Sequence, residues 1–292
     1  MHSSASAKLV GFLFVLPALA FVLFFVIWPF VQLVGTSFTN QSLLGGGGFV
    51  GLANYQRAFG DAQFRKALWF TLKYTVIITP ILIVLGFGLA LLTAPNTPLR
   101  QFTRAVIFLP VVIGLGASSL LWYWLFDEQV GLVNKLLVDL HVIAHPLVWF
   151  TSADMALWAV IISVTWKVVG FGMILFVAGI QAVGKEINEA AMIDGASYLQ
   201  RVWRITLPLN LPIILLVTLV SAIGSMLAFD QLYIMTGGGP RGQTFTSVYW
   251  IYQNSFIKFQ LGYGAALSVI LTVIIFLAAA LQIYLTSRSA AK

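Results

Sequence analysis

The chain has 292 residues, of which 60% are hydrophobic and only 9% are charged, with a formal net charge of +7 and no cysteine. A soluble domain of this size carries about 25% charged residues, so the composition excludes a soluble enzyme with a large core and indicates a protein that crosses a membrane several times. The lack of cysteine excludes disulfides and cysteine-based metal sites, and the thinly spread positive charge does not form the concentrated basic face of a nucleic-acid-binding protein.

The first apolar run extends from residue 9 to about residue 35 and raises the question of a signal peptide. A cleavable signal has an apolar core of about 7–15 residues. This run is longer and contains Pro17 and Pro29. We therefore expect a retained first transmembrane helix.

Six apolar stretches are long enough to cross about 30 Å of hydrocarbon. They lie near residues 9–35, 67–92, 105–126, 156–182, 209–235 and 263–286. The predicted fold class is therefore all-α, a polytopic membrane protein with six transmembrane helices. We expect residues 1–292 to form a single transmembrane domain.

The basic residues predict which side of the membrane each loop occupies. An even number of spans places both termini on the same side. The segments that share the side of the termini are 1–8, 93–104, 183–208 and 287–292. Basic residues are denser in these segments than in the remaining loops. Positive residues concentrate on the cytoplasmic side of membrane proteins, so we expect a multi-pass protein of a bacterial inner membrane with both termini in the cytoplasm.

One polar segment, residues 183–208, separates the fourth and fifth apolar stretches. Residues 186–193 are compatible with a helix, and the Asp-Gly pair at 194–195 then interrupts the pattern, since glycine permits a positive φ. A second amphipathic turn follows over residues 199–205, before Pro208 closes the segment and opens the fifth span. Two interpretations remain open from these patterns: a knob that docks a soluble partner, or an interfacial connector between spans.

The same segment contains the pattern E-A-A-x3-G-x9-I-x-L-P, which begins at Glu189 and ends at Pro208. It resembles the EAA loop of the membrane subunits of binding-protein-dependent ABC importers, and every lettered position of that motif is met. Two further patterns are similar to the carbohydrate-uptake branch, which includes the maltose and glycerol-phosphate permease subunits: F-V-G-L at 49–52, followed by Asn-Tyr at 54–55, and M-T-G-G-G-P at 235–240. The resemblance covers nearly the whole chain.

The resemblance implies the fold of a type I ABC importer permease. In that family the EAA loop is a coupling helix, which sits in a groove of a cytoplasmic ATPase subunit and transmits nucleotide-driven closure to the membrane spans. The residues to which this role is carried over are Glu189, Ala190, Ala191, Asp194, Gly195, Ile205, Leu207 and Pro208. The implied partners are a second permease subunit, expected to form a heterodimer with this chain, two ABC ATPase subunits and an extracytoplasmic solute-binding protein, together with membrane lipid and no nucleic acid.

A near match to a phosphate-binding P-loop lies beside this segment, from Gly179 through Gly184 to Glu186. A P-loop needs Ser or Thr at its last position to hold Mg²⁺ and follows a strand, whereas here that position is Glu186 and an apolar span precedes it. We therefore expect no enzyme activity, no catalytic residue, no metal and no cofactor in this chain. ATP and Mg²⁺ are expected on the partner ATPase subunits.

Ionisable side chains within the apolar stretches are functional candidates. Lys73 and Asp230 lie near the outer ends of their spans. Lys167 lies deeper in the fourth span, where lining of the translocation path and packing against another subunit remain equal alternatives.

A sugar path needs hydroxyl or amide groups and aromatic faces. Ser221 and Ser225 share a helix face, with helix packing in the membrane as the alternative. Alignment with the similar maltose permease subunit places both serines at polar sugar contacts and Phe171 at an aromatic one. The chain departs from that pattern at Val111, Leu115 and Ala228, so the identity of the solute does not transfer. The candidates for the solute path are Lys167, Phe171, Ser221 and Ser225.

The sequence thus predicts the transmembrane subunit of an ATP-driven importer that moves a sugar or sugar-like solute, such as an oligosaccharide, a polyol or glycerol phosphate, across the cytoplasmic membrane. The main alternative is an ion-coupled secondary transporter, which needs embedded carboxylates or broken helices; Asp230 is the only embedded acid. A channel or scaffold without active transport is a further alternative. The residues leave open which solute is moved, whether the partner permease is identical or different, which subunit holds the main solute site, and what Lys167 and Asp230 do.

Overall fold

The structure, a computed structural model, describes residues 3–290, with side chains for residues 10–184 and 186–286. The chain divides into two units: unit 1 is drawn from Met1–Ala62 and Ile251–Ile274, and unit 2 from Gln63–Trp250 and Ile275–Lys292. Four basic side chains of the predicted cytoplasmic segments lie outside the described residues: Lys8, Lys185, Arg288 and Lys292. The expectation of one transmembrane domain over residues 1–292 stays a prediction.

Unit 1 contains the first apolar helix, which is interrupted by one π-helical turn. Its elements are α1 (Ser3–Val22), η1 (Leu23–Ile27), α2 (Trp28–Ser37), α3 (Ala53–Gly60), η3 (Gln253–Ile257) and the first part of α15 (Leu261–Ala290). Asn54 holds the loop before α3, since its Nδ2 donates to the carbonyls of Ser37 at 2.9 Å and Thr39 at 2.7 Å. Tyr55 adds a hydrogen bond of 2.6 Å with Ser37 Oγ. These contacts explain the Asn-Tyr pair that the sequence singled out.

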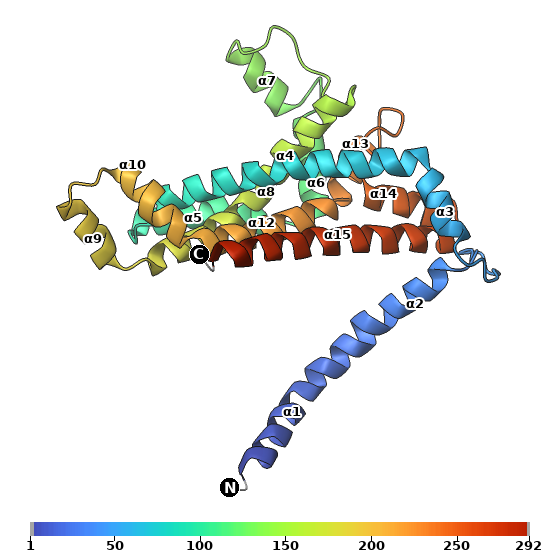
Figure 1. Cartoon of the computed structure of the whole chain (residues 1–292). Helices are drawn as coiled ribbons and strands as arrows, with labels where there is room; N and C mark the ends of the chain where they lie inside the picture. Colours follow the sequence, from blue (N-terminus) through green and yellow to red (C-terminus); the bar gives the residue numbers. More distant parts are fainter. Residues whose placement is uncertain (1–2, 291–292) are drawn as a thin grey trace. The chain divides into compact units, whose positions relative to one another are not determined.

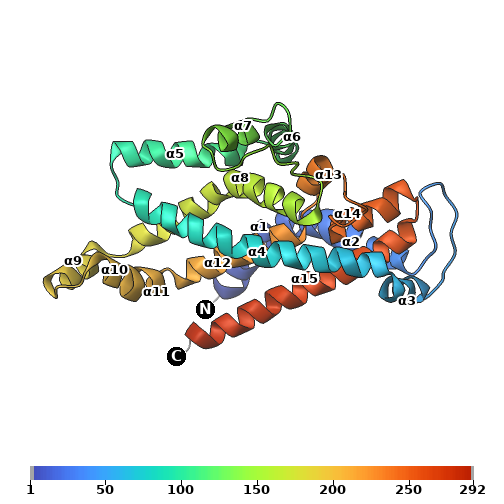
Figure 2. The ribbon, with the colours of Figure 1, turned by 90° about the horizontal axis from the view of Figure 1, so that it is seen from above.

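Unit 2 is a group of helices packed along α8 (Figure 1 and Figure 2). Its elements are α4 (Ala62–Thr93), α5 (Pro98–Val112), α6 (Leu115–Leu125), α7 (Leu132–Asp139), α8 (Ala153–Ala182), α9 (Lys185–Ile193), α10 (Tyr198–Arg201), η2 (Val202–Thr206), α11 (Leu207–Leu209), α12 (Leu211–Met226), α13 (Asp230–Thr236), α14 (Ser247–Tyr252) and the last part of α15. The segment from α9 to α11 lies at the end of the unit opposite α13 in both views.

Close backbone approach explains why α8 is the central helix of unit 2. Gly170 faces the backbone of α5, where an added Cβ would lie 2.5 Å from the carbonyl oxygen of Ile107. A Cβ built on Gly86 of α4 would lie 3.4 Å from the backbone nitrogen of Met173 on α8. Small residues at such crossings let membrane helices pack tightly in the absence of a hydrophobic driving force between them. As a result, 61% of the most apolar window of α8 is buried, against 33% for α4.

The count of membrane spans agrees with the prediction of six. Within the described part of the chain, four helices are long and apolar enough to cross a membrane: Val10–Ser37, Ala62–Thr93, Ala153–Ala182 and Leu261–Thr286. Two bent pairs bring the number to as many as six: Pro98–Val112 with Leu115–Leu125, and Tyr198–Leu209 with Leu211–Met226. Two of the predicted spans therefore exist as broken rather than continuous helices.

The predicted third span, residues 105–126, bends by 98° between α5 and α6. Ile113 and Gly114 are extended at the break, with ψ of 134° and 144°. Pro110 lies one turn earlier and has no N–H to donate, which weakens the end of α5. The predicted apolar stretch is therefore present, but it forms two helices instead of one continuous helix.

The predicted fifth span, residues 209–235, is interrupted at both ends. α12 ends at Met226, and three non-helical residues separate it from α13. Pro208 does not open this span, because the helix continues to Leu209 and the chain bends by 67° at Asn210. The bend falls there because Pro212 has no N–H with which to continue the hydrogen-bond ladder.

Candidate functional site

The polar segment between α8 and α12 forms a helix-turn-helix whose turn is specified locally. α9 ends at Ile193, and Gly195 follows in the left-handed region with a φ of +77°. The N–H of Ala196 donates to the carbonyl of Ala191 at 2.9 Å, and the N–H of Gly195 donates to that of Met192 at 3.0 Å. These two bonds are the Schellman arrangement that ends a helix at a glycine.

A capping box starts the next helix two residues later. Ser197 Oγ accepts from the N–H of Gln200 at 3.4 Å, and Gln200 Oε1 accepts from the N–H of Ser197 at 2.8 Å. This reciprocal pairing satisfies two free donors at the start of α10. The S-x-x-Q pattern was present in the sequence and would have placed this helix start. We call the whole segment from α9 to α11, residues 185–209, the knob.

The predicted coupling residues are all placed on the knob, in two groups. The first group lies on α9 and its turn: Glu189, Ala190, Asp194 and Gly195 are exposed there, and Ala191 is half-buried. The second group lies at the junction with α12, where Ile205 and Leu207 are half-buried and Pro208 is exposed. Across the described side chains Glu189 makes no ion pair or hydrogen bond. The first group is therefore free to meet another molecule, whereas the second group sits where the knob joins the membrane helices.

Large apolar side chains on the knob are also exposed, and sequence reasoning did not single them out as a docking surface. Ile193 is 88% exposed, Trp203 is 67% exposed and Leu199 is 66% exposed. A turn that is held by two capping motifs yet presents such side chains to its surroundings has the composition of an interaction surface. The amphipathic spacing noted for residues 199–205 was the available signal.

A groove of about 610 Å³ lies between the knob and the loop that joins α4 to α5. Glu189 and Arg201 both line it, and the Nε of Arg201 is buried without a hydrogen-bond partner in the described structure. The loop side of the groove, which includes Ala94, is held by a polar cap. Arg104 donates to the carbonyls of Thr93 and Ala94, both at 2.8 Å, so that a basic side chain closes the C-terminus of α4.

A cavity of about 230 Å³ lies inside unit 2, between α4, α6, α8, α12 and α13. It brings together three of the four predicted path residues, Phe171, Ser221 and Ser225. Four of its fifteen lining residues carry a polar side-chain group: Tyr74, Ser221, Ser225 and Gln231. The remaining lining residues are aliphatic, glycine or phenylalanine, and Leu115, one of the departures from the maltose-permease pattern, is among them.

Tyr74 and Gln231 are the cavity residues that sequence reasoning missed. Both are buried, at 1% and 6% exposed, and both line the cavity. The signal was weak, because each lies next to an ionisable residue, Lys73 or Asp230, that drew attention as the candidate. An amide and a phenol in an apolar wall are the groups that fix the orientation of a polar ligand.

Lys167 is not among the residues that line this cavity. Its Nζ donates to the carbonyl of Ile113 at 2.6 Å and to that of Val111 at 3.3 Å. Both carbonyls lie at the break between α5 and α6, where they have no partner from a following helical turn. A cation also complements the negative end of the α5 dipole. The geometry thus gives the buried lysine a local role as a cap on a broken membrane helix.

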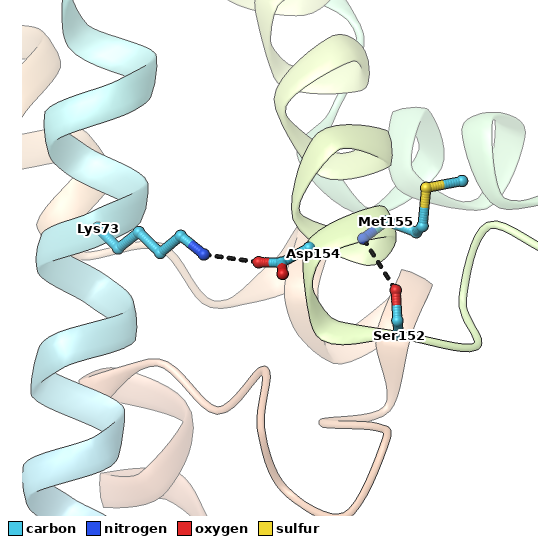
Figure 3. A network of polar contacts seen from close by, with 4 residues as sticks. All are labelled: Lys73, Ser152, Asp154 and Met155. Carbon is cyan, nitrogen blue, oxygen red and sulfur yellow. Dashed lines mark hydrogen bonds and ion pairs between the residues drawn. The ribbon is translucent and has the colours of Figure 1, made fainter.

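Of the two other embedded ionisable residues, Lys73 of α4 pairs with the N-terminus of α8 and Asp230 lies at the N-terminus of α13. Asp154 lies in the first turn of α8 and accepts from Lys73 Nζ of α4 at 2.6 Å, beside the cap in which Ser152 accepts from the N–H of Met155 (Figure 3). The ion pair is largely exposed, so it contributes little to stability. Asp230 lies in the first turn of α13, where a carboxylate is favoured by the helix dipole. Among the described residues no three His, Asp or Glu side chains are grouped so as to hold a metal ion.

Comparison with known proteins matches the chain over most of its length. The family model described as binding-protein-dependent transport system inner membrane component matches residues 82–290. The sulfoquinovosyl glycerol transport system permease protein SmoG of Agrobacterium fabrum is 34% identical over 90% of this chain and 86% of its own. The trehalose/maltose transport system permease protein MalF of Thermococcus litoralis is 32% identical over 92% of this chain and 90% of its own.

Two further comparisons extend the likeness. The sn-glycerol-3-phosphate transport system permease protein UgpA of Agrobacterium fabrum is 31% identical over 94% of each chain. A solved chain of a bacterial ABC transporter involved in the import of the acidic polysaccharide alginate is 19% identical, covers 97% of this chain and 96% of its own, and superposes with a TM-score of 0.84. At that identity the structural likeness concerns the fold alone.

Proposed function

We propose that this chain, which belongs to the family of binding-protein-dependent transport system inner membrane components, is the membrane-spanning subunit of an ATP-driven importer of a sugar or sugar-like solute. The relatives that it matches over nine tenths of its length are permease proteins of transport systems for a sulfoquinovosyl glycerol, for trehalose and maltose, and for glycerol phosphate. A shared fold by itself would not support a solute class; the sequence identity over almost the whole chain does.

The observation that carries the proposal is the knob, which is ordered by its own caps and yet presents exposed apolar side chains beside the exposed carboxylate of Glu189. A cytoplasmic ATPase subunit is the partner that fits this surface, with Ile193 and Leu199 entering an apolar groove and Glu189 meeting a basic side chain. ATP and Mg²⁺ belong to that partner. Nucleotide-driven closure of two ATPase subunits would then move the knob against the membrane helices.

The cavity of unit 2 is the proposed segment of the solute path in this chain. Its volume of about 230 Å³ compares with about 30 Å³ for one water in the liquid, so it admits a group of the size of a single sugar ring. Phe171 offers an aromatic face, and Ser221, Ser225 and Gln231 offer hydroxyl and amide groups. Lys167 supports this path by holding the α5–α6 break in place and does not touch the solute in this arrangement.

The remaining partners follow from the same proposal. A second permease subunit would complete the path, an extracytoplasmic binding protein would deliver the solute, and both termini and the knob would lie in the cytoplasm. The knob and α13 lie at opposite ends of unit 2, which supports their placement on opposite sides of the membrane. An ion-coupled secondary transporter is not favoured, because the family that the chain matches is that of binding-protein-dependent transport systems, and its relatives are permease proteins of such systems.

Reversal of one charge tests the proposal. In proteoliposomes that contain the chain with its partner permease, ATPase and binding protein, Glu189→Lys is expected to abolish solute uptake and to release the ATPase subunit on purification. Glu186→Lys is the matched control, since Glu186 is exposed on the same helix, and it is expected to retain both. Equal uptake by the two variants, or uptake that collapses when an ionophore dissipates ion gradients but not when ATP is removed, would contradict the proposal.

A further inference from the structure

The bend that joins the knob to α12 is a hydrogen-bonded joint rather than a frayed helix end. Asn210 lies at the 67° break, with φ of −89° and ψ of 1°. Its N–H donates to the carbonyl of Thr206 at 3.0 Å, and its own carbonyl accepts from the N–H groups of Ile213 at 3.0 Å and Ile214 at 2.9 Å. The backbone therefore changes direction while its hydrogen bonds remain satisfied on both sides.

The side chain of Asn210 is buried at this joint, with none of its surface exposed. Its Nδ2 donates to the carbonyl of Thr206 at 2.8 Å, which closes the end of the π-helical turn η2. Its Oδ1 has no hydrogen-bond partner in the described structure. An unpartnered buried acceptor is destabilising, and such groups in native proteins require an explanation beyond packing. π-helical turns also occur frequently at functional sites.

Gly179 of α8 forms the seat of this side chain. A Cβ built on Gly179 would overlap Oδ1 of Asn210 and Cδ1 of Ile213. A methyl group at this position would therefore displace the ends of the Asn210 and Ile213 side chains from the joint. This contact accounts for the glycine at residue 179, which is the first position of the incomplete P-loop match.

The seat and the cavity lie on the same seam between α8 and α12. Val217 lies on α12, seven residues after Asn210. Gly172 lies on α8, seven residues before Gly179. A Cβ built on Gly172 would lie 3.6 Å from Val217 Cγ1. Residues at i and i+7 lie on one face of a helix. Val217 and Gly172 both line the cavity, so one continuous contact runs from the joint to the proposed solute path.

We infer that Asn210, seated on Gly179, is the pivot that carries a movement of the knob into α12 and hence into the cavity wall. The Nδ2 bond to Thr206 ties the knob to the joint, and the close fit on Gly179 keeps the joint fixed on α8 while α12 swings. Asn210 is thus a positioning residue, which touches neither solute nor nucleotide. The inference rests on the proposed function, since it describes how the knob would act on the path.

The first test separates the amide of Asn210 from its volume. Asn210→Leu keeps the number and branching of the side-chain heavy atoms but loses the donor to Thr206, whereas Asn210→Ser keeps a donor that can reach a carbonyl one turn back. Coupling between sites in proteins is worth about 5–150-fold, so in the reconstituted complex we expect uptake per ATP hydrolysed to fall about tenfold in Asn210→Leu and to stay near wild type in Asn210→Ser. Wild-type coupling in Asn210→Leu would overturn the inference, as would an equal loss of uptake and ATPase activity, which would show a structural role only.

The second test uses the seat and a direct measure of movement. The chain has no cysteine, so spin labels at Glu186→Cys and Leu216→Cys, both exposed, report the distance from the knob to α12 in a complex with cysteine-free partners. ATP is expected to shift this distance in the wild type and in Gly88→Ala, where nothing lies within 4 Å of the added methyl. Gly179→Ala is expected to lose the shift while ATP is still hydrolysed.

The outcomes also distinguish the pivot from the proposed function. An unchanged ATP-dependent shift in Gly179→Ala would overturn the pivot and leave the importer intact. A wild-type complex without ATP-dependent uptake would overturn the proposed function and the pivot with it.

Discussion

Asn134→Ala is expected to destabilise the segment around α7 by about 2–4 kcal/mol, because it removes a buried side chain that joins three separate parts of this segment. Asn134 is 1% exposed. Its Nδ2 donates to the carbonyls of Asp127 at 3.2 Å and Leu147 at 2.9 Å, and its Oδ1 accepts from the N–H of Leu147 and the indole of Trp149, both at 3.1 Å. Each bond contributes about 0.5–1.5 kcal/mol net, and water entering the vacated space would recover part of the four.

Hydrogen exchange of the backbone amides of residues 128–150 in nanodiscs measures this change directly. A loss of 2–4 kcal/mol corresponds to exchange that is about 30- to 1,000-fold faster wherever opening of this segment controls exchange. Gln129→Ala is the matched control, since that side chain is exposed in the same segment, and it is expected to leave exchange unchanged. Exchange in Asn134→Ala within a factor of about three of wild type would refute the reasoning, because it would mean that the four bonds have no net value.

Three further predictions address the α8 seam, the cavity and the turn that follows α6. Gly170→Ala places a methyl group 2.5 Å from the carbonyl oxygen of Ile107 and 2.9 Å from Phe108 Cα. Because these backbone atoms cannot move aside, we expect a destabilisation of about 1–3 kcal/mol, measured as a lower midpoint of thermal unfolding. Gly88→Ala is the control and is expected to leave the midpoint unchanged. Gln231→Leu is expected to raise the solute concentration for half-maximal uptake about fivefold, the value of one hydrogen bond of about 1 kcal/mol, while Gln243→Leu in an exposed loop has no effect; equal values for both would remove Gln231 from the path. The N–H groups of Val130 and Gln129 hold the pKa of the Asp127 carboxyl below its ordinary value. Because the folded pKa is lowered, this carboxylate stabilises the turn fully above the ordinary pKa of about 3.9. It loses that effect as the pH falls through the folded pKa. Protection of the Gln129 and Val130 amides from hydrogen exchange should therefore decrease on acidification, and Asp127→Asn should lack this pH dependence.

The knob was predictable because its signals are local. The helix over residues 186–193, the left-handed glycine that ends it and the S-x-x-Q box that starts the next helix depend on residues within one or two turns. The exposure of Glu189 also follows, since a polar residue on a short amphipathic helix rarely finds a buried partner. What the pattern does not give is the direction in which the knob leaves α12, and this direction depends on packing against α8.

The helix breaks illustrate the limit most clearly. Proline at residue 110 and at residue 212 accompanies a bend, yet Pro17 and Pro80 lie inside helices that remain continuous. The same residue type therefore breaks one span and not another, and the outcome depends on what can satisfy the freed backbone groups. At the α5–α6 break that partner is Lys167, which lies more than fifty residues away in the sequence.

The sequence by itself determined the class of protein, the number of apolar stretches and the knob, because hydrocarbon thickness and helix capping act on contiguous residues. Only the tertiary structure decided that Tyr74 and Gln231 share the cavity with Ser221 and Ser225, that Lys167 caps a broken helix, and that Asn210 rests on Gly179. These relations join residues from different helices, and the order in which helices pack in a membrane depends on the fit of small surfaces that no single stretch of sequence contains.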